Sequence, residues 1–214
     1  MSAKTALVQA WYFYNMDFAD IKACYDVAQN AFKNWHSYQN ADELEIALRV
    51  VKKFAPKVIV EIGIANGASL ASWAEIAKPD IAIGIDPLNN PKTMQQEMSL
   101  GKLIHDYDLK IIPHIDRAPE AHKKLIELLD GRKIDFLFID AEHRYDDVRY
   151  DYYEYVKYLN HPSIVGFHDV YFSEHIFDSG SQVSALWERL KRQNIDYDEI
   201  HFHSTMGIGI LHIP

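Results

Sequence analysis

From residue 57 onward, short runs of β-branched and other apolar residues alternate with segments of helical periodicity. The apolar runs predict strands, and the segments between them predict helices. Such alternation favours a parallel sheet covered by helices on both faces. We therefore expect a doubly wound α/β fold, with strands at 58–62, 81–85, 109–113, 134–139 and 163–167 and helices at 68–77, 92–105, 117–130, 145–159 and 181–193.

The C-terminal end departs from this alternation. Residues 197–202 and 208–213 predict two strands joined by a short turn, with no helix between them. Strands joined so closely form an antiparallel hairpin, so one of the two must run against the rest of the sheet. We therefore expect a mostly parallel seven-stranded sheet with a C-terminal antiparallel hairpin.

The N-terminal part is predicted to be helical. Residues 20–38 and 41–55 predict two helices, and Pro56 ends the second. Residues 1–19 are rich in aromatic side chains and could pack on the core or form a lid or substrate wall. We expect residues 1–56 to form an N-terminal helical or lid segment and residues 57–214 to form the main domain.

The bulk composition limits the partners. A chain of 214 residues suits one α/β domain with a small appendage. Its formal net charge is −9 and it has no basic cluster, which argues against a nucleic-acid partner. Cys24 is the only cysteine, so no intrachain disulfide can form. Without a signal peptide or an apolar run of membrane length, we expect no membrane partner and a cytoplasmic location.

The first predicted strand of the main domain has an acid near its end. A glycine-containing turn and then a helix follow it. The residues that follow this pattern are Glu61, Gly63, Ala65, Gly67 and Ser69. Glycines there let the backbone approach a ligand closely, and a carboxylate can accept hydrogen bonds from hydroxyl or ammonium groups. Taken alone, the same pattern also suits a purely structural turn.

Each later strand also ends in acids or in a His–Asp pair. In open α/β sheets, ligands bind at the carboxyl ends of the strands. The sequence therefore predicts a functional edge, to which these strand ends contribute Asp86, His114, Asp116, Asp140, Glu142, His143, His168 and Asp169.

The spacing of the first two strand ends favours a nucleoside without a pyrophosphate. Asp86 is placed to accept hydrogen bonds from ribose hydroxyls. The glycine pattern differs from the dinucleotide fingerprint G-x-G-x-x-G, and Glu61 would repel a pyrophosphate. An anionic site suits a positively charged amino-acid group, which favours S-adenosylmethionine. A nicotinamide-dependent oxidoreductase is a weaker alternative.

Three stretches carry a resemblance to known enzymes. Residues 61–70 resemble the first motif of class I S-adenosylmethionine-dependent methyltransferases, and that resemblance extends over about residues 57–213. Residues 138–148 and 166–170 are similar to small-molecule O-methyltransferases of the cephalosporin-hydroxylase and macrolide-sugar type. This sequence departs from the pattern of those enzymes at three places. Ala141 replaces a glycine, and Pro162-Ser163 stands where a Pro-Gly-Gly turn is common. His168 stands where the macrolide-sugar enzymes carry Glu.

The resemblance implies roles for the residues at the strand ends. His143 would be the general base, and Asp116 would accept a hydrogen bond from the adenine amino group. Asp140 and Asp169 end neighbouring strands, so they could share a divalent metal such as Mg²⁺ or Mn²⁺, with His168 as a third ligand. His168 could instead only orient Asp169 or contact the substrate. The expected cofactor-binding residues are Glu61, Gly63, Ala65, Gly67, Ser69, Asp86, Asp116 and Asp140.

Together these patterns predict an S-adenosylmethionine-dependent, metal-assisted O-methyltransferase that acts on a hydroxyl of a small molecule, such as a sugar or natural product. Two alternatives stay open: a methyltransferase without metal and a non-catalytic nucleoside-binding module. We expect residues 1–19 and 170–180 to set the acceptor, and the chain could associate as a homo-oligomer.

Overall fold

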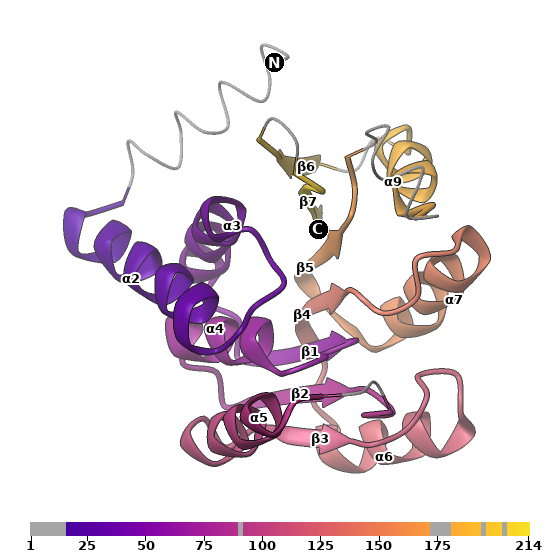
Figure 1. The fold of residues 1–214 in the computed structure, drawn as a ribbon. Coiled ribbons are helices and arrows are strands. Elements are labelled where there is room, and N and C mark those ends of the chain that lie inside the picture. Colours follow the sequence, from indigo (N-terminus) through magenta and orange to yellow (C-terminus); the bar gives the residue numbers. More distant parts are fainter. Residues whose placement is uncertain (1–15, 90–91, 172–180, 194–195, 203–204) are drawn as a thin grey trace.

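The computed structural model describes residues 16–89, 92–171, 181–193, 196–202 and 205–214. Its seven-stranded sheet has the order β3-β2-β1-β4-β5-β7-β6 (Figure 1). All neighbouring strands from β3 to β5 are parallel, while β7 runs antiparallel to both β5 and β6. The predicted sheet with its reversed C-terminal hairpin is therefore confirmed. The strands are β1 Val58–Ile62, β2 Ile81–Ile85, β3 Lys110–Ile112, β4 Ile134–Ile139, β5 Leu159–His168, β6 Asp196–Ile200 and β7 Ile208–Ile213.

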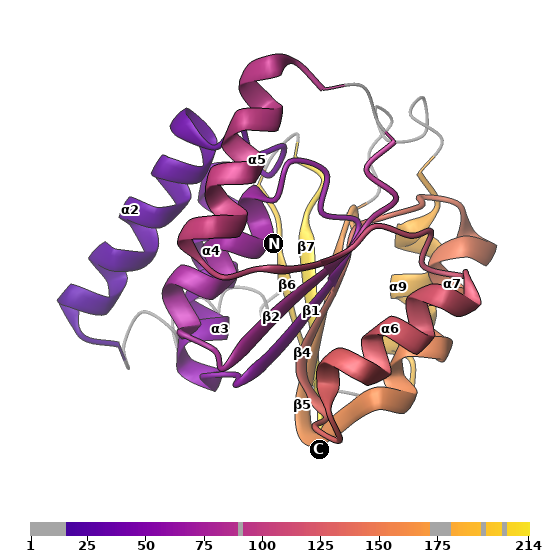
Figure 2. The ribbon, with the colours of Figure 1, turned by 90° about the horizontal axis from the view of Figure 1, so that it is seen from below.

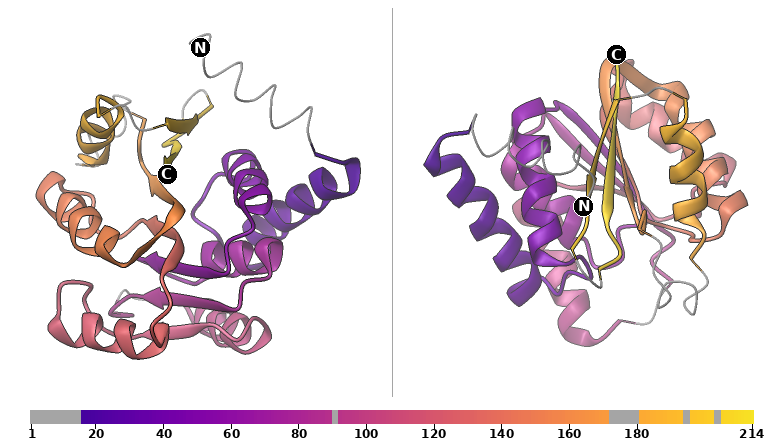
Figure 3. Two further views of the ribbon diagram at one scale, coloured as in Figure 1. Left: turned by 180° about the vertical axis from the view of Figure 1, so that it is seen from behind. Right: turned by 90° about the horizontal axis from the view of Figure 1, so that it is seen from above.

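Helices cover both faces of the sheet (Figures 2 and 3). One face is covered by α2 Phe18–Asn34, α3 Ala41–Phe54, α4 Ala68–Ala77 and α5 Met94–Asp106. The other face carries α6 Pro119–Leu129, α7 Tyr145–Tyr155 and α9 Val183–Lys191. Successive residues of a strand point to opposite faces, so each strand supplies both cores. In β4, for example, Phe136 and Phe138 join the first core and Leu137 joins the second.

The N-terminal helices pack on α4 and share its core. Cys24 and Ala28 of α2 and Leu44 and Leu48 of α3 are buried in the same cluster as Trp73 of α4. Side chains that accept backbone N–H groups begin both helices, Asp17 for α2 and Asn40 for α3. Residues 1–15, which contain most of the aromatic segment singled out from the sequence, lie outside the described residues.

The strand and helix predictions differ from the structure mainly at the end of α2, where the helix predicted for 20–38 ends at Asn34, and around β5. The helix predicted for 145–159 ends at Tyr155 and is followed by one 3₁₀ turn, Val156–Tyr158. The strand predicted for 163–167 begins earlier, because Leu159 already pairs with Ile134 before the register shifts. Burial of Leu159 in the sheet ends the helical segment sooner than its sequence pattern indicates.

None of the helices within the described ranges is long and apolar enough to cross a membrane. The carboxyl ends of β1, β2, β3, β4 and β5 meet at one edge of the sheet, because these strands are parallel. The acidic and histidine residues predicted at the strand ends are therefore brought to this edge.

Candidate functional site

The turn after β1 joins three strands at the centre of the sheet. Gly63 N donates to the carbonyl of Ile85 at 2.9 Å, and Asp140 N donates to the carbonyl of Ile62 at 2.9 Å. Gly63 has φ +82°, and a Cβ at this position would lie 2.2 Å from the carbonyl oxygen of Asp140. Only glycine fits here, both because of its backbone conformation and because of the space available.

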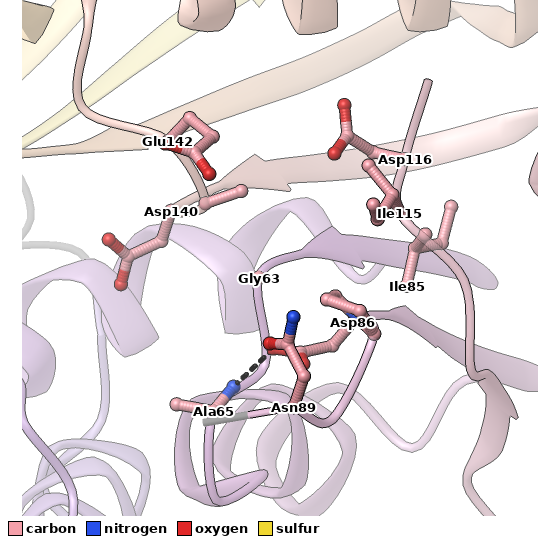
Figure 4. A pocket seen from close by; sticks show the side chains of 11 residues that line it. Gly63, Ala65, Ile85, Asp86, Asn89, Ile115, Asp116, Asp140 and Glu142 are labelled. Carbon is pink, nitrogen blue, oxygen red and sulfur yellow. Dashed lines mark hydrogen bonds between the residues drawn. The ribbon is translucent and has the colours of Figure 1, made fainter. Parts of the chain in front are cut away.

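Asp86 fastens this turn to the end of β2. Its Oδ2 accepts hydrogen bonds from the N–H groups of Ile64 at 3.1 Å and Ala65 at 2.9 Å, and its Oδ1 accepts from Leu88 N at 2.6 Å. Figure 4 shows the contact between Asp86 and Ala65. Asp86 thus holds the glycine-containing turn in place. Each carboxylate oxygen can accept more than one hydrogen bond, so a ligand hydroxyl could still be accommodated.

A cavity of about 210 Å³ lies at this edge (Figure 4). Four of its lining side chains carry carboxyl groups, and none carries a lysine or arginine charge. An anionic lining suits a ligand with positive charge and hydroxyl groups and does not suit a pyrophosphate. The lining residues are Gly63, Ala65, Ile85, Asp86, Pro87, Asn89, Ile115, Asp116, Asp140, Ala141 and Glu142.

Five of the predicted cofactor-binding residues line this cavity, and three do not. Gly63, Ala65, Asp86, Asp116 and Asp140 are at its wall. Gly67, the residue before α4, and both Glu61 and Ser69 lie away from the cavity wall. Their contact with a ligand stays a prediction.

Glu61 is enclosed beneath the turn. Its side chain is 0% exposed and accepts hydrogen bonds from Ser69 Oγ and from Trp73 Nε1, the latter at 2.9 Å. Burial raises the pKa of Glu61 well above its usual value. In this arrangement Glu61 ties β1 to α4 and does not present its carboxyl group to the cavity.

Beside the cavity, the ends of β4 and β5 bring together Asp140, His143, His168 and Asp169. His168 Nδ1 lies 3.0 Å from Asp169 Oδ1 and 3.4 Å from Asp140 Oδ1. His143 Nδ1 lies 3.1 Å from Asp169 Oδ2, and His143 Nε2 lies 3.7 Å from Asp140 Oδ1. The two carboxylates predicted to converge therefore do so, with imidazoles between them.

Asp169 is the most constrained member of this cluster. It has φ +61°, which is uncommon for a residue with a side chain. Its side chain is 2% exposed, and its Oδ2 lies 3.1 Å from His143 Nδ1 but makes no hydrogen bond of good geometry with any described residue. Backbone strain and a buried polar atom without a hydrogen bond are typical of functional sites.

The paired charges shift the pKa values of the cluster in opposite directions. Burial would lower the pKa of His168, but the charges of Asp140 and Asp169 and their hydrogen bonds raise it to about 10. Burial would likewise raise the pKa of Asp140, but His168 and His143 lower it to about 2. The nearby carboxylates of Asp140 and Asp169 raise the pKa of His143. His168 is thus held as a cation between carboxylates.

Two residues that the sequence did not indicate reach this cluster from the N-terminal part. Gln39, in the loop between α2 and α3, is 4% exposed and donates from Nε2 to Asp140 Oδ2 at 2.6 Å. Glu43 of α3 is also buried and accepts a hydrogen bond from Thr205 Oγ1; burial raises its pKa, and the nearby His168 opposes that shift. Gln39 is 101 residues from Asp140 in sequence, so no local pattern could have indicated the contact.

Within the described part of the chain, no three His, Cys, Asp or Glu side chains stand in a geometry that would hold a metal ion. The predicted metal ligands Asp140, His168 and Asp169 are nevertheless adjacent. In this structure the carboxylates of Asp140 and Asp169 lie against ring nitrogens of His168 and His143.

Comparison with known proteins places this chain among methyltransferases. The profile of a family described as a methyltransferase domain matches residues 60–170. The uncharacterized protein R132 of Acanthamoeba polyphaga mimivirus is 35% identical over 114 residues. This match covers 51% of the chain and 50% of the viral protein, so the chain spans about half the length of the curated relative it matches.

Solved structures share the fold at low sequence identity. A Staphylococcus aureus protein described as a caffeoyl-CoA O-methyltransferase has a TM-score of 0.60 and 15% identity, over 100% of both chains. An O-methyltransferase from Bacillus cereus, solved with S-adenosylhomocysteine, has a TM-score of 0.58 and 13% identity, over 98% of both chains. The O-methyltransferase TomG from Streptomyces achromogenes, which is involved in tomaymycin synthesis and was solved with S-adenosylmethionine, has a TM-score of 0.56 and 16% identity, over 93% of this chain and 91% of its own.

Proposed function

Because the chain belongs to the methyltransferase domain family, we propose that it transfers the methyl group of S-adenosylmethionine to a hydroxyl of a small molecule. The observation that carries this proposal is the juxtaposition of two features at one edge of the sheet. One is the anionic cavity after β1 and β2, and the other is the cluster of Asp140, His143, His168 and Asp169. Asp140 belongs to both.

The chemistry of the cavity fits this methyl donor. S-adenosylmethionine carries a sulfonium, an ammonium and a ribose but no phosphate, and the carboxyl groups at the wall suit positive charges and hydroxyls. In this proposal Asp86 accepts hydrogen bonds from the ribose hydroxyls, and Asp116 accepts one from the adenine amino group; both line the cavity. The O-methyltransferases of similar fold from Bacillus cereus and Streptomyces achromogenes were solved with the cofactor or its product, which supports the same ligand here.

His143 is proposed to remove the acceptor proton. As the acceptor oxygen forms its bond to the methyl carbon and the bond from that carbon to sulfur breaks, the hydroxyl proton passes to an imidazole nitrogen of His143. The carboxylates of Asp140 and Asp169 lie within 3.7 Å and 3.1 Å of the ring, so they orient it and stabilise the imidazolium that forms. The exposed side of His143 leaves room for an acceptor.

The side chains beside His143 are of the chemical types that bind divalent cations. Asp140 and Asp169 supply hard carboxylate oxygens, one of them buried without a hydrogen bond, and His168 supplies an imidazole. These three residues would hold the ion, with His168 at the position where the macrolide-sugar enzymes carry Glu. When bound, a cation of this kind would lower the pKa of the acceptor hydroxyl.

One observation favours a second form of the proposal, in which no metal takes part. His168 already offsets part of the negative charge of Asp140 and Asp169 with its own positive charge. In that form His168 would donate a hydrogen bond to the acceptor or hold the two carboxylates in position. The transferred group and the role of His143 are the same in both forms.

Two measurements test the proposal. Calorimetric titration should show that the protein binds S-adenosylhomocysteine and does not bind NAD. Transfer of a labelled methyl group should then be assayed with catechols, sugars and macrolides as acceptors, in EDTA and in added Mg²⁺ or Mn²⁺. Activity restored only by metal supports the first form, and undiminished activity in EDTA supports the second. Binding of S-adenosylhomocysteine without transfer to any acceptor would favour a nucleoside-binding module.

A further inference from the structure

The loop after β3 is held by one face of α7. Asp147, Asp151 and Tyr155 are four residues apart, so they lie on the same face of that helix. Asp147 Oδ1 pairs with Arg117 Nη1 at 2.8 Å, and Tyr155 OH donates to the carbonyl oxygen of Asp116 at 2.7 Å. Between them on this face, the carboxyl group of Asp151 neighbours that of Asp116. Three successive turns of α7 therefore contact this short loop.

The carboxyl groups of Asp116 and Asp151 form a buried pair. Asp151 is 0% exposed and Asp116 is 5% exposed. Neither oxygen of Asp151, nor Oδ2 of Asp116, accepts a hydrogen bond from any N–H or O–H donor of the described residues. Two ionised carboxylates cannot be buried side by side without large repulsion, so the pair retains one proton. Asp151 is the more deeply buried of the two, and burial and the neighbouring Asp116 raise its pKa, so we place the proton on Asp151.

The two members of the pair are placed differently with respect to the cavity. Asp116 lines the cavity wall, as Figure 4 shows. Asp151 of α7 is fully buried and is not part of the cavity lining. Arg117 Nε is 3.7 Å from Asp116 Oδ2, too long for a hydrogen bond that would fix the carboxylate. A protonated Asp151 that donates a hydrogen bond from the side away from the cavity is therefore the group that can fix the orientation of the Asp116 carboxylate.

We propose that Asp151 is a positioning residue, whose carboxylic acid donates a hydrogen bond to Asp116 and thereby orients the Asp116 carboxylate as the acceptor for the amino group of the adenine. The inference rests on the proposed function, because it requires an adenine nucleoside in the cavity. It adds a residue that does not touch the ligand but decides which nucleobase the cavity accepts. A carboxylate aimed at the base favours an amino group and repels the oxo group of hypoxanthine.

The test compares S-adenosylhomocysteine with S-inosylhomocysteine, in which an oxo group replaces the adenine amino group. Both are titrated calorimetrically into the wild-type protein and three variants. Asp151→Leu removes the hydrogen-bond donor at similar volume, and Asp151→Asn keeps a donor. Asp146→Asn is the matched control, because Asp146 lies on the exposed face of the same helix. If the leucine variant does not fold, Asp151→Ala replaces it.

Wild type, Asp151→Asn and Asp146→Asn should bind the adenosyl compound about tenfold or more tightly than the inosyl compound, as expected for one charge-assisted hydrogen bond. In Asp151→Leu the preference should fall to about twofold or less. The inference is overturned if that variant keeps the full preference, if it loses affinity for both compounds equally, or if Asp151→Asn loses the preference. A wild-type protein that binds neither compound would overturn the proposed function, whereas binding of both without preference would overturn only the inference.

Discussion

At the scale of single residues, the carboxyl groups of the site fall into two kinds. Asp86, Asp116 and Asp140 are at the cavity wall, whereas Glu61 and Asp151 are enclosed behind it. Both enclosed acids have raised pKa values, because burial disfavours their charged form. The anionic character of the site therefore comes from the first kind, and its shape depends on the second.

The proposed base is tested by His143→Ala. Loss of a general base that lies against two carboxylates should lower kcat by about 10²- to 10⁴-fold, while the Kd of S-adenosylhomocysteine stays within about twofold. Single-turnover methyl transfer and calorimetry measure the two quantities. His105→Ala is the control, because the His105 side chain is 90% exposed on α5. Unchanged turnover in His143→Ala at neutral pH would refute the assignment.

Glu61→Gln tests whether Glu61 stays protonated in the fold. The raised pKa means that, above a pH of about 4.3, the unfolded chain releases this proton while the folded chain keeps it. Wild-type stability therefore falls as pH rises through this window, by up to about 1.4 kcal/mol per pH unit, and the glutamine variant lacks this loss. Urea unfolding at pH 5 and pH 8 should show the variant gaining relative to wild type at the higher pH. Glu120→Gln, at an exposed position of α6, should show no such gain, and a parallel pH response of the Glu61 variant and wild type would contradict the prediction.

At the scale of elements, the site depends on connections between elements that are distant in the chain. The turn after β1 contacts the end of β4, α7 contacts the loop after β3, and the loop between α2 and α3 contacts the end of β4. Each connection fixes one part of the sheet edge. A substitution at one of these contacts should therefore disturb the site more than it disturbs the helix, strand or loop in which the substituted residue lies.

Gly63→Ala should disrupt the connection between β1 and β4. The methyl group would meet the Asp140 carbonyl oxygen at 2.2 Å, in addition to the strain of a positive φ. Gly131→Ala separates the two effects, because Gly131 also has a positive φ, +78°, but nothing lies within 4 Å of its Cβ position. Urea unfolding should show a loss of about 1 kcal/mol for Gly131→Ala and a clearly larger loss for Gly63→Ala. Equal losses of stability in the two variants would contradict this prediction, because they would mean that the structure accommodates the new methyl group beside the Asp140 carbonyl without a free-energy cost.

Gln39→Leu tests the contact of the α2–α3 loop with the site. Removal of the donor to Asp140 Oδ2 should lower kcat roughly tenfold, because a hydrogen bond to a charged group contributes about 1.5–3 kcal/mol. Tyr38→Phe alters the adjacent residue, whose hydroxyl faces Gln96 on α5, and serves as the control. Steady-state kinetics at saturating cofactor gives the comparison, and equal kcat values for the two variants would argue against a role of Gln39 in holding Asp140.

At the scale of the whole molecule, two hydrophobic cores lie on opposite faces of one sheet. The first includes α2 and α3 together with α4, and the second includes α6, α7 and α9. Every central strand contributes side chains to both cores, so neither can be lost without exposing the other. We therefore propose that the N-terminal helical segment and the main domain unfold together.

Leu48→Ala and Leu125→Ala test this coupling. Leu48 of α3 and Leu125 of α6 are both 0% exposed, one in each core. Each substitution should cost about 2–5 kcal/mol and shift a single transition, seen at the same urea concentration by circular dichroism and by tryptophan fluorescence. A second transition at lower urea in Leu48→Ala alone would show that the N-terminal helices unfold independently.

The sequence predicted the fold well because its signals are local. Periodicity, the prolines and the glycine-containing turn each act within a few residues, and they predicted the alternating elements and the C-terminal hairpin. The strand ends also predicted that Asp140 and Asp169 would meet, since parallel neighbours end at a common edge. The early start of β5 at Leu159 was not predicted, because pairing with Ile134 outweighed the helical pattern.

The sequence by itself determined the sheet, the edge at which its acids gather and the chemical types of the candidate ligands. Only the tertiary structure decided which acids face the cavity and which stand behind it, as the contrast between Asp86 and Glu61 shows. It also decided that Gln39 contacts Asp140 and that Asp151 contacts Asp116. The physical reason is that burial, the charge of a carboxyl group and the direction of its hydrogen bonds depend on neighbours from remote parts of the chain.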